Sequence, residues 1–197
     1  PLRRQRQMCI RDRSYEGIEG LSIDITGGNI SVTASDDGLN AAGGNDSSGF
    51  EGAGGDQFAA TEGAYIHISG GVMHVNAEGD GIDSNGDLTV SGGETYISGP
   101  VNDGNSALDY NGEAVISGGT FVAAGSSGMA QNFGSSSTQG TVLVSVGSQE
   151  AGSVVSLQDS DGTELMQWEP DKVYTSVLIS CPELTKDSTY TVSAGTY

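Results

Sequence analysis

The chain has little positive charge, little cysteine and no long apolar run. Of its 197 residues only 7 are Lys or Arg, against 26 Asp or Glu, and the formal net charge is −19. A chain this acidic repels phosphate, so no nucleic acid is expected as a partner. No apolar stretch approaches the roughly 18 residues that a spanning helix needs, so no membrane insertion is expected either.

Cysteine and proline are also scarce, with 2 and 4 residues, whereas glycine contributes 32. Cys181 is the only cysteine outside an atypical N-terminal segment, so we expect no internal disulfide. Many secreted bacterial proteins lack disulfides, and export is therefore not excluded. The acidic, lysine-poor composition, rich in Gly, Ser and Thr, favours an extracellular or cell-surface protein, either a monomer or part of a larger surface protein.

The N-terminal segment differs from the rest in charge. Residues 1–13 hold five of the seven basic residues, and from Ser14 onward only Lys172 and Lys186 face 25 acids, a net charge of about −23. We interpret residues 1–13 as a non-native segment, similar to a translated sequencing adapter. A natural basic arm for an anionic surface is the alternative. The segment lacks the apolar core of a signal peptide, so no export signal is recognised.

A short motif of one small residue and two glycines recurs along the chain. Its first glycines are 43, 22 and 26 residues apart, and a Gly-rich acidic insertion at residues 45–63 accounts for the longest spacing. A period in the twenties, made of strands, is typical of a β-solenoid. The four motifs are Thr26-Gly27-Gly28, Ser69-Gly70-Gly71, Ser91-Gly92-Gly93 and Ser117-Gly118-Gly119.

Apolar residues alternate with polar ones on both sides of each motif, as in strands with one buried face. The inward positions before the glycines are predicted to be Leu21, Ile23, Ile25, Ile66, Ile68, Leu88, Val90, Ala114 and Ile116. Those after the glycines are Ile30, Val32, Ala34, Met73, Val75, Ala77, Thr95, Ile97, Phe121 and Ala123. The outward positions are Asp24, His67, Thr89 and Val115, and then Ser31, His74, Tyr96 and Val122.

The predicted fold is all-β: a right-handed parallel β-helix over residues 14–140 and a C-terminal antiparallel β cap within residues 141–197. The right hand follows from the general preference for right-handed crossovers between parallel strands. Strands are expected at residues 141–146, 153–157, 163–168, 174–180 and 190–193, with a hairpin turn at 159–162. We expect one further coil after residue 140 and then the cap, which would cover the open end.

A second corner follows each pair of glycines. Three of these corners are acidic and are predicted to lie in register: Asp36-Asp37-Gly38-Leu39-Asn40, Asp80-Gly81-Ile82-Asp83 and Asp103-Gly104-Asn105. The fourth corner, Ser126-Ser127-Gly128-Met129, has no acid. Leu39, Ile82 and Met129 are expected to point inward. Stacked unit charges about 5 Å apart repel by roughly 3 kcal/mol at an effective dielectric of 20. The corners then either spread into solvent, keep protons, or share cations.

Oxygen-rich corners with glycine suit Ca²⁺, which takes six to eight oxygen ligands. The alternative is that Asp-Gly and Asn-Gly are ordinary solvated turns. The candidate metal ligands are Asp37, Asn40, Asp80, Asp83, Asn85, Asp87, Asp103 and Asp109.

Some aromatic and histidine side chains are candidates for contact with sugars. We select Tyr96, Tyr110 and His74, and Trp168 and Tyr174 could also stack or could pack inside the cap. Packing or plain exposure remains the alternative for each aromatic ring. His67 and His74 could assist a metal site or could be exposed polar residues, because no other feature suggests zinc.

The segments 80–93, 98–110 and 125–134 resemble the carbohydrate-binding parallel β-helix family of cell-surface proteins in cellulolytic clostridia and gut Firmicutes. The resemblance covers roughly residues 15–197. It implies a right-handed parallel β-helix similar to polysaccharide lyases, bound calcium, and binding to cellulose and polygalacturonate-type glycans. It implies no established catalytic residue. Ser127 departs from the acidic pattern, so no ion is expected at that corner.

We therefore expect an extracellular, non-catalytic module that binds plant cell-wall polysaccharide with the help of calcium. One alternative is a pectin-active enzyme. Residues 14–140 contain no Arg or Lys to act as the base of a lyase, which leaves a hydrolase with Asp80, Asp83 and Asp103 as the more plausible enzyme. A structural surface adhesin is the other alternative. Fold alone does not decide between these functions.

Overall fold

The computed structural model describes residues 13–42 and 60–195, which form strands and loops with no helix. The all-β prediction is confirmed for this part. Within it there is no helix long and apolar enough to cross a membrane. Of the predicted N-terminal segment only Arg13 is described, where it begins β1 (Arg13–Ser14), and most of the insertion also lies outside the described residues.

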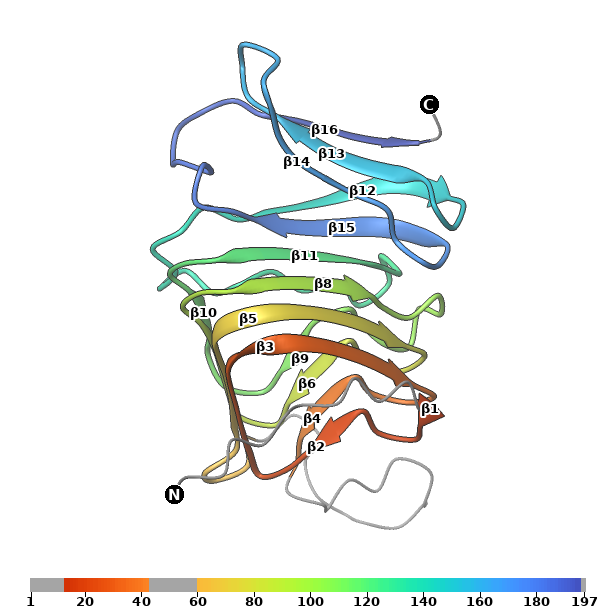
Figure 1. Cartoon of the computed structure of the whole chain (residues 1–197), viewed down its shortest axis with the longest axis vertical. Helices are drawn as coiled ribbons and strands as arrows, with labels where there is room; N and C mark the ends of the chain where they lie inside the picture. The colour runs from red at the N-terminus through yellow and green to blue at the C-terminus, as the bar shows by residue number, and fades with distance from the viewer. Residues whose placement is uncertain (1–12, 43–59, 196–197) are drawn as a thin grey trace, which may run out of the picture.

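The largest sheet is mainly parallel. Its central path runs from β1 through β3 (Ser22–Ala34), β5 (Tyr65–Ala77) and β8 (Glu94–Ser98) to β11 (Thr120–Gly125). Beside it, β7 (Asp87–Val90) pairs with both β5 and β10 (Ala114–Ile116). In Figure 1 the strands β3, β5, β8 and β11 lie one above another.

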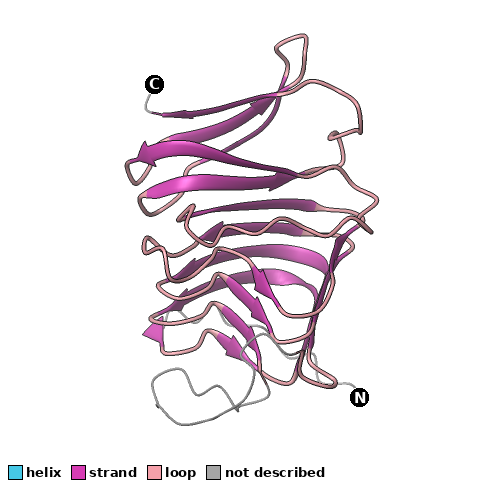
Figure 2. Cartoon of the chain, turned by 180° about the vertical axis from the view of Figure 1, so that it is seen from behind, coloured by secondary structure: helices cyan, strands magenta, loops and turns pink. Residues whose placement is uncertain are grey.

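A second, small parallel sheet lies behind the first and is visible from the back in Figure 2. It consists of β2 (Ile18–Glu19), β4 (Leu39–Ala41), β6 (Ile82–Ser84) and β9 (Asp109–Tyr110), in that order. The chain passes from the large sheet to the small one at the acidic corners, so these corners lie between the ends of the large-sheet strands and the starts of the small-sheet strands.

The predicted register of the apolar positions is confirmed by the strand pairing. Ile23 pairs with Ile66, Ile66 with Leu88, and Leu88 with Ala114, and all four side chains are buried. The second apolar row is also in register and shares the same core. Leu21 was predicted to point inward and is 46% exposed, because it precedes β3 and lies at the bend before that strand.

The paired glycines form bends, as predicted. The second glycine of each pair has a positive φ, with values of 103°, 94°, 86° and 87° at Gly28, Gly71, Gly93 and Gly119. This backbone region favours glycine because a side chain would be strained there. The strands β3 and β5 continue through their bends, which explains their length of 13 residues each.

The C-terminal strands are antiparallel and match the predicted positions closely. They are β12 (Val142–Gln149), β13 (Val154–Gln158), β14 (Glu164–Trp168), β15 (Tyr174–Ser180) and β16 (Thr191–Gly195). β15 lies between β11 and β12, and β13 lies between β14 and β16. The further coil expected after residue 140 is wrong, because β12 pairs with β15 in the antiparallel sense.

These strands enclose a second apolar core, which corrects two predictions. Val122 was expected to point outward, yet it is fully buried, because it belongs to the second core together with apolar side chains of β13, β14 and β15. Met129 was expected to point inward and is 41% exposed. The residue that follows Leu39 and Ile82 in register is Leu108, which was not selected from the sequence; it directly precedes β9 and is buried.

Candidate functional site

Two acidic corners lie in register, as predicted. Leu39 pairs with Ile82 and Asn40 with Asp83, and the Gly38 N–H donates to the Asp80 carbonyl at 2.9 Å. Asp37 therefore lies next to Asp80 on the neighbouring strand. The spacing between adjacent strands of about 4.8 Å keeps their carboxylates close.

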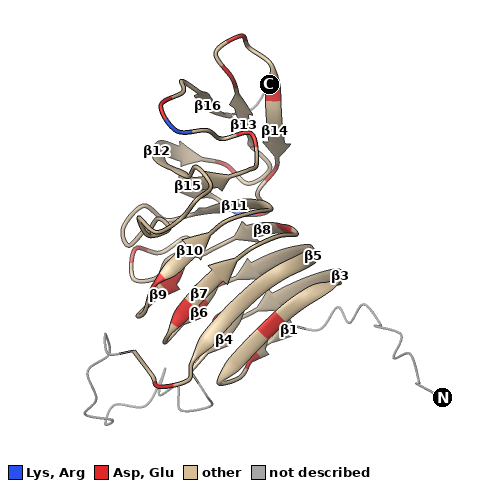
Figure 3. Cartoon of the chain, turned by 90° about the vertical axis from the view of Figure 1, so that its left-hand side faces the viewer, with Lys and Arg blue, Asp and Glu red and all other residues tan. Residues whose placement is uncertain are grey.

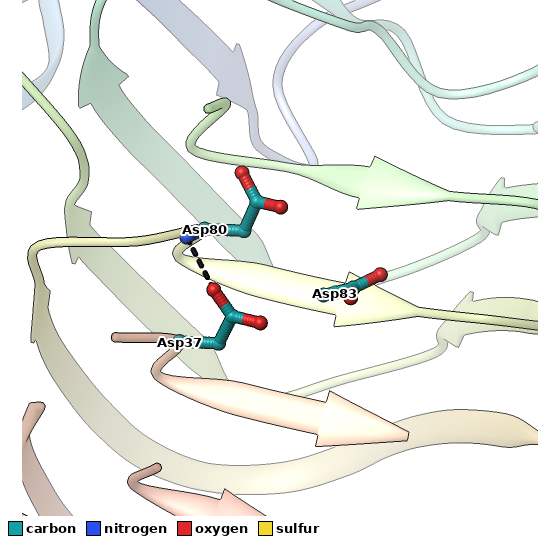
Figure 4. Close-up of side chains that lie close together, drawn as sticks. All are labelled: Asp37, Asp80 and Asp83. Carbon is teal, nitrogen blue, oxygen red and sulfur yellow. Dashed lines mark hydrogen bonds between the residues drawn. The ribbon is translucent and has the colours of Figure 1, made fainter. Parts of the chain in front are cut away.

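Asp37, Asp80 and Asp83 form an acidic cluster that could hold a metal ion. One carboxylate oxygen of each lies within 4.8 Å of the others. Asp37 is 7% exposed, and the other two are half-buried. Figure 4 shows the carboxylates of Asp37 and Asp80 on the same side of the ribbon, with Asp83 beyond them on β6. Three carboxylates at this distance provide hard oxygen ligands for a divalent cation.

Backbone hydrogen bonds hold two of these carboxylates in place. The Asp80 N–H donates to Asp37 Oδ1 at 2.6 Å, and the Ser106 N–H donates to Asp80 Oδ1 at 2.5 Å. Asn40, which is fully buried, donates from Nδ2 to Asp37 Oδ2 at 3.2 Å. The same backbone-to-carboxylate link therefore repeats from one corner to the next and helps to fix the geometry of the cluster.

Burial raises the pKa of Asp80 from 3.8 to about 7. The hydrogen bond from the Ser106 N–H lowers the pKa, and the nearby negative charges of Asp37, Asp109 and Asp36 raise it further. The charged form of Asp80 is thus disfavoured by lost hydration first and by repulsion second. A bound cation would act in the opposite direction, because it favours the carboxylate.

Asp103 does not lie in register with the other two corners, which corrects the predicted stack. Asp83 pairs with Asp109, and the Gly81 N–H donates to the Ser106 carbonyl at 3.1 Å, so Ser106 occupies the third position. Asp103 is exposed in a preceding turn and accepts a hydrogen bond from Ser126 Oγ. The sequence signal for the true corner is an apolar residue followed by an acid, Leu108-Asp109.

The remaining predicted ligands lie outside the acidic cluster. Asp109 is in register with Asp83, but its Oδ1 accepts hydrogen bonds from the Tyr110 N–H and from Gln131 Nε2. Asn85 and Asp87 belong to the next bend. There Asn85 Oδ1 accepts from Asn111 Nδ2 at 3.1 Å, and Asp87 Oδ1 accepts from the Glu113 N–H at 2.9 Å.

Two features of the corners were missed from the sequence. Glu16-Gly17-Ile18-Glu19 forms an earlier corner, because Ile18 pairs with Leu39 and Glu19 with Asn40. Lys172, from the loop between β14 and β15, donates to the Ala77 carbonyl and lies 3.7 Å from Glu78. The pattern Glu-Gly-Ile-Glu could have revealed the first. No local pattern could have revealed the second, because Lys172 is 95 residues away from Ala77.

A row of three rings lies on the outer face of the large sheet. His74 stacks on Tyr96 with ring centroids 5.0 Å apart and an angle of 13°, and Tyr96 lies 5.9 Å from Trp168. Tyr96 Oη donates to Glu94 at 3.1 Å. We call these three residues the aromatic row. It joins two predicted residues, His74 and Tyr96, to Trp168 of the antiparallel region.

The two other tyrosines considered for sugar contact are not in this row. Tyr110, in the small sheet, packs against the first core, and its Oη donates to the Asn132 carbonyl at 2.7 Å. Tyr174 is buried in the second core, and its Oη donates to the Ser153 carbonyl at 3.0 Å. Packing, the alternative raised for Tyr174, is confirmed.

A cleft of about 830 Å³ opens between the turn after β10 and the loop before β16. Hydroxyl, amide and glycine groups line much of it, among them Ser117, Gly118, Ser137, Thr138 and Gln139. Comparison of the chain with family models, with curated proteins and with solved structures gave no match. The functional argument therefore depends on the geometry of the acidic cluster, the aromatic row and this cleft.

Proposed function

We propose that this domain binds polysaccharide outside the cell, with cellulose and polygalacturonate-like acidic glycans as the expected partners. The observation that carries the proposal is the aromatic row. Sugar rings have apolar C–H faces, and flat aromatic rings offer matching surface at low entropic cost. His74 is exposed, and Tyr96 and Trp168 are half-buried, so each ring is held firmly while part of it remains open to solvent.

We further propose that the parallel strands are the successive turns of a right-handed parallel β-helix, closed at one end by the antiparallel strands. The regular in-register pairing of β3, β5, β8 and β11 supports this interpretation. A long regular face of this kind is suited to a linear polymer. The likeness of segments 80–93, 98–110 and 125–134 to carbohydrate-binding proteins of the cell surface agrees with it.

The ion proposed for the acidic cluster is calcium. Ca²⁺ accepts several carboxylates in flexible geometry, and among the described residues no Cys or His joins Asp37, Asp80 and Asp83 as is usual in a zinc site. Because Asp37 is buried, we propose that the ion sits inside the corner and supports binding mainly by ordering it. Calcium titration followed by calorimetry tests this. Asp83→Asn should weaken binding at least about 10-fold, and Asp103→Asn should leave it unchanged.

Binding rather than cleavage of the polymer backbone is the function that the geometry supports better. The three carboxylates considered for a hydrolase are not brought together, because Asp103 lies outside the cluster. A pull-down with insoluble cellulose and with polygalacturonate tests the proposal. Trp168→Ala should reduce the retained protein about 10-fold or more, because the central ring of the aromatic row loses its neighbour.

Tyr110→Phe is the control for this pull-down, because it alters an aromatic side chain that lies in the small sheet, outside the aromatic row. Retention should equal that of the wild type. Chelator should weaken retention on both polymers, because the ion is proposed to order the corner rather than to contact the sugar. Failure of both polymers to retain the wild-type protein, with calcium present, would refute the polysaccharide proposal.

A further inference from the structure

Four polar side chains form a connected line across the outer face of β3, β5 and β7. Tyr65 Oη donates to Asp24 Oδ2 at 3.0 Å, and Asp24 Oδ1 lies 3.5 Å from His67 Nδ1. On the other side of the ring, His67 Nε2 lies 3.3 Å from Ser91 Oγ. The carboxylate thus faces one ring nitrogen and the serine hydroxyl faces the other.

Ser91 differs from the serines at equivalent bends. Ser69 Oγ donates to the Ile25 carbonyl at 3.4 Å, and Ser117 Oγ donates to the Val90 carbonyl at 3.5 Å. In both cases the hydroxyl bonds to the backbone of the neighbouring strand. At Ser91 the hydroxyl faces His67 instead. The Ser-Gly-Gly bend itself is a structural feature, so the presence of His67 is what sets Ser91 apart.

We propose that Ser91, His67 and Asp24 form a catalytic triad that hydrolyses carboxylic esters. The roles follow from the geometry. With its proton on Nδ1, directed to Asp24, the imidazole presents the lone pair of Nε2 to the Ser91 hydroxyl. Ser91 is then the nucleophile and His67 the general base. Asp24 is a positioning residue that holds the ring, and Tyr65 holds Asp24. The distances are those of a triad without substrate, where such contacts are often loose.

The backbone at Ser91 is held and closely packed. The Ser91 N–H donates to the Ile68 carbonyl at 2.8 Å, and Gly93 has a φ of 86°. A Cβ on Gly92 would lie 2.7 Å from the Ser69 carbonyl oxygen, so the bend excludes larger residues. Within the described part of the chain neither Gly92 nor Gly93 donates a backbone hydrogen bond. Their N–H groups, directly after the nucleophile, are the donors we assign to the oxyanion.

The cleft begins next to this triad. Val90 pairs with Ile116, so Ser91 neighbours Ser117, and a Cβ on Gly118 would meet the Ser91 carbonyl oxygen at 2.6 Å. Ser117 and Gly118 line the 830 Å³ cleft together with the hydroxyl and amide groups of residues 137–139. A hydroxyl-rich wall is suited to the polar part of an ester, such as a sugar. The substrate class is therefore a small carboxylic ester of a carbohydrate.

The reaction balances with water as the only co-reactant. Ser91 Oγ attacks the ester carbonyl carbon while its proton passes to His67 Nε2. The C–O bond to the alcohol breaks, and the departing oxygen takes that proton, which leaves an acyl group on Ser91. Water then attacks the acyl carbon and gives a proton to Nε2, which returns it to Ser91 Oγ as the acid departs. The products are one carboxylic acid and one alcohol.

This activity goes beyond the proposed binding function and does not depend on it. It uses no metal, breaks no glycosidic bond, and lies on strand positions that neither the acidic cluster nor the aromatic row occupies. The side chains of His67 and Asp24 are 39% and 51% exposed, so an ester carried on a polymer can reach them.

The test uses a fluorophosphonate probe and three ester substrates on the full chain. The probe should label Ser91, identified by mass spectrometry of the labelled peptide. Hydrolysis of p-nitrophenyl acetate should fall about 100-fold or more in Ser91→Ala and His67→Ala. Asp24→Asn should lower kcat about 10-fold at unchanged KM and displace the pH profile, which a merely structural role would not do. Acetylated xylan and methyl-esterified pectin distinguish an ester of the sugar hydroxyl from an ester of a uronate.

Ser69→Ala is the matched control. It alters the serine of the same Ser-Gly-Gly motif in β5, whose hydroxyl donates to the Ile25 carbonyl and does not face the His67 ring. It should keep the wild-type rate and labelling. Melting temperatures of all variants within about 2 °C of wild type show that the fold is kept, as expected for exposed positions. Labelling of another serine, or hydrolysis equal in wild type and Ser91→Ala, would overturn the proposal.

Discussion

Most glycines of the parallel region lie against a neighbouring strand, and some of them also have a positive φ, whereas those of residues 141–195 have a positive φ and open space around them. A Cβ on Gly81, in the parallel region, would lie 2.3 Å from Ile97 Cγ2 and 2.4 Å from the Ala107 carbonyl oxygen. A Cβ on Gly147, in the antiparallel region, would meet nothing within 4 Å, and this residue has a φ of 69°. The first is selected by close packing between strands and the second by backbone conformation.

The two regions also differ in charge. Figure 3 shows acidic segments in both regions, but residues 14–140 hold no Lys or Arg, whereas the antiparallel region holds Lys172 and Lys186. Lys172 connects the two, because it extends from the β14–β15 loop to Ala77 and Glu78 beside the Asp80 corner. The parallel region thus concentrates carboxylates in register, and the antiparallel region supplies the lysine nearest to them among the described residues.

Gly81→Ala should give the largest loss of stability. The methyl group would overlap a carbonyl oxygen and a buried side chain, and neither can move without disturbing a strand. We expect the free energy of unfolding to fall by about 4–5 kcal/mol. Gly147→Ala should cost about 1 kcal/mol, from backbone strain alone. Chemical denaturation measures both, and equal losses would contradict the distinction between the two regions.

Asp80→Asn should give the next largest effect, with a sign that depends on calcium. The pKa of Asp80 lies above its ordinary value of 3.8, at about 7. The folded protein therefore binds the proton more tightly than the unfolded chain. Without cation, the contribution of Asp80 to stability is complete below about pH 4 and is lost as the pH rises toward 7, by roughly 2–4 kcal/mol.

In Asp80→Asn this decline should be smaller by the same amount, because the amide resembles the protonated carboxyl. The variant should be more stable than wild type at pH 7 in chelator and should gain nothing from calcium. Thermal melts from pH 4 to pH 8, with and without calcium, provide the measurement. A wild-type curve parallel to that of the variant would contradict the assigned burial of Asp80.

Val122→Ser should destabilise the fold, because the second core covers this face of β11. Val122 is fully buried, so the loss of apolar contact and the burial of a hydroxyl should cost about 2 kcal/mol. Val115, in the other outward row, is half-buried, and Val115→Ser should cost less than about 1 kcal/mol. The difference between the denaturation midpoints of the two variants tests whether the antiparallel strands cover the row of Val122 and leave the row of Val115 uncovered.

Lys172→Met should have the smallest effect. It removes the hydrogen bond to the Ala77 carbonyl and the ion pair with Glu78, which together should stabilise the fold by about 1 kcal/mol. Lys186→Met, in the loop before β16, removes the same charge from an exposed position and should cost less than about 0.5 kcal/mol. Hydrogen exchange at the Asp80 corner should increase only in the first variant.

Local sequence patterns were sufficient to predict strands and turns wherever the segment itself contains the alternation or the turn residues. Alternation around paired glycines led to the register of Ile23, Ile66 and Leu88, and the hairpin turn at 159–162 was recognised from its residue types. The Asp103 corner was misplaced because a turn at residues 102–104 imitates the acidic corner three residues before the real one. From the sequence, the corner was placed by its Asp-Gly pair. It should have been placed by the apolar residue Leu108, which follows Ile82 in register.

The sequence by itself determined that the chain is all-β, which residues alternate toward the core, and that Asp37 and Asp80 meet at one edge. These features follow from the alternation of apolar and polar residues, which can be read within each strand segment. Only the tertiary structure decided that Val122 is covered, that Lys172 reaches the acidic corner, and that His67 lies between Asp24 and Ser91. Each of these depends on which distant strands become neighbours, and that is settled by the packing of the whole chain.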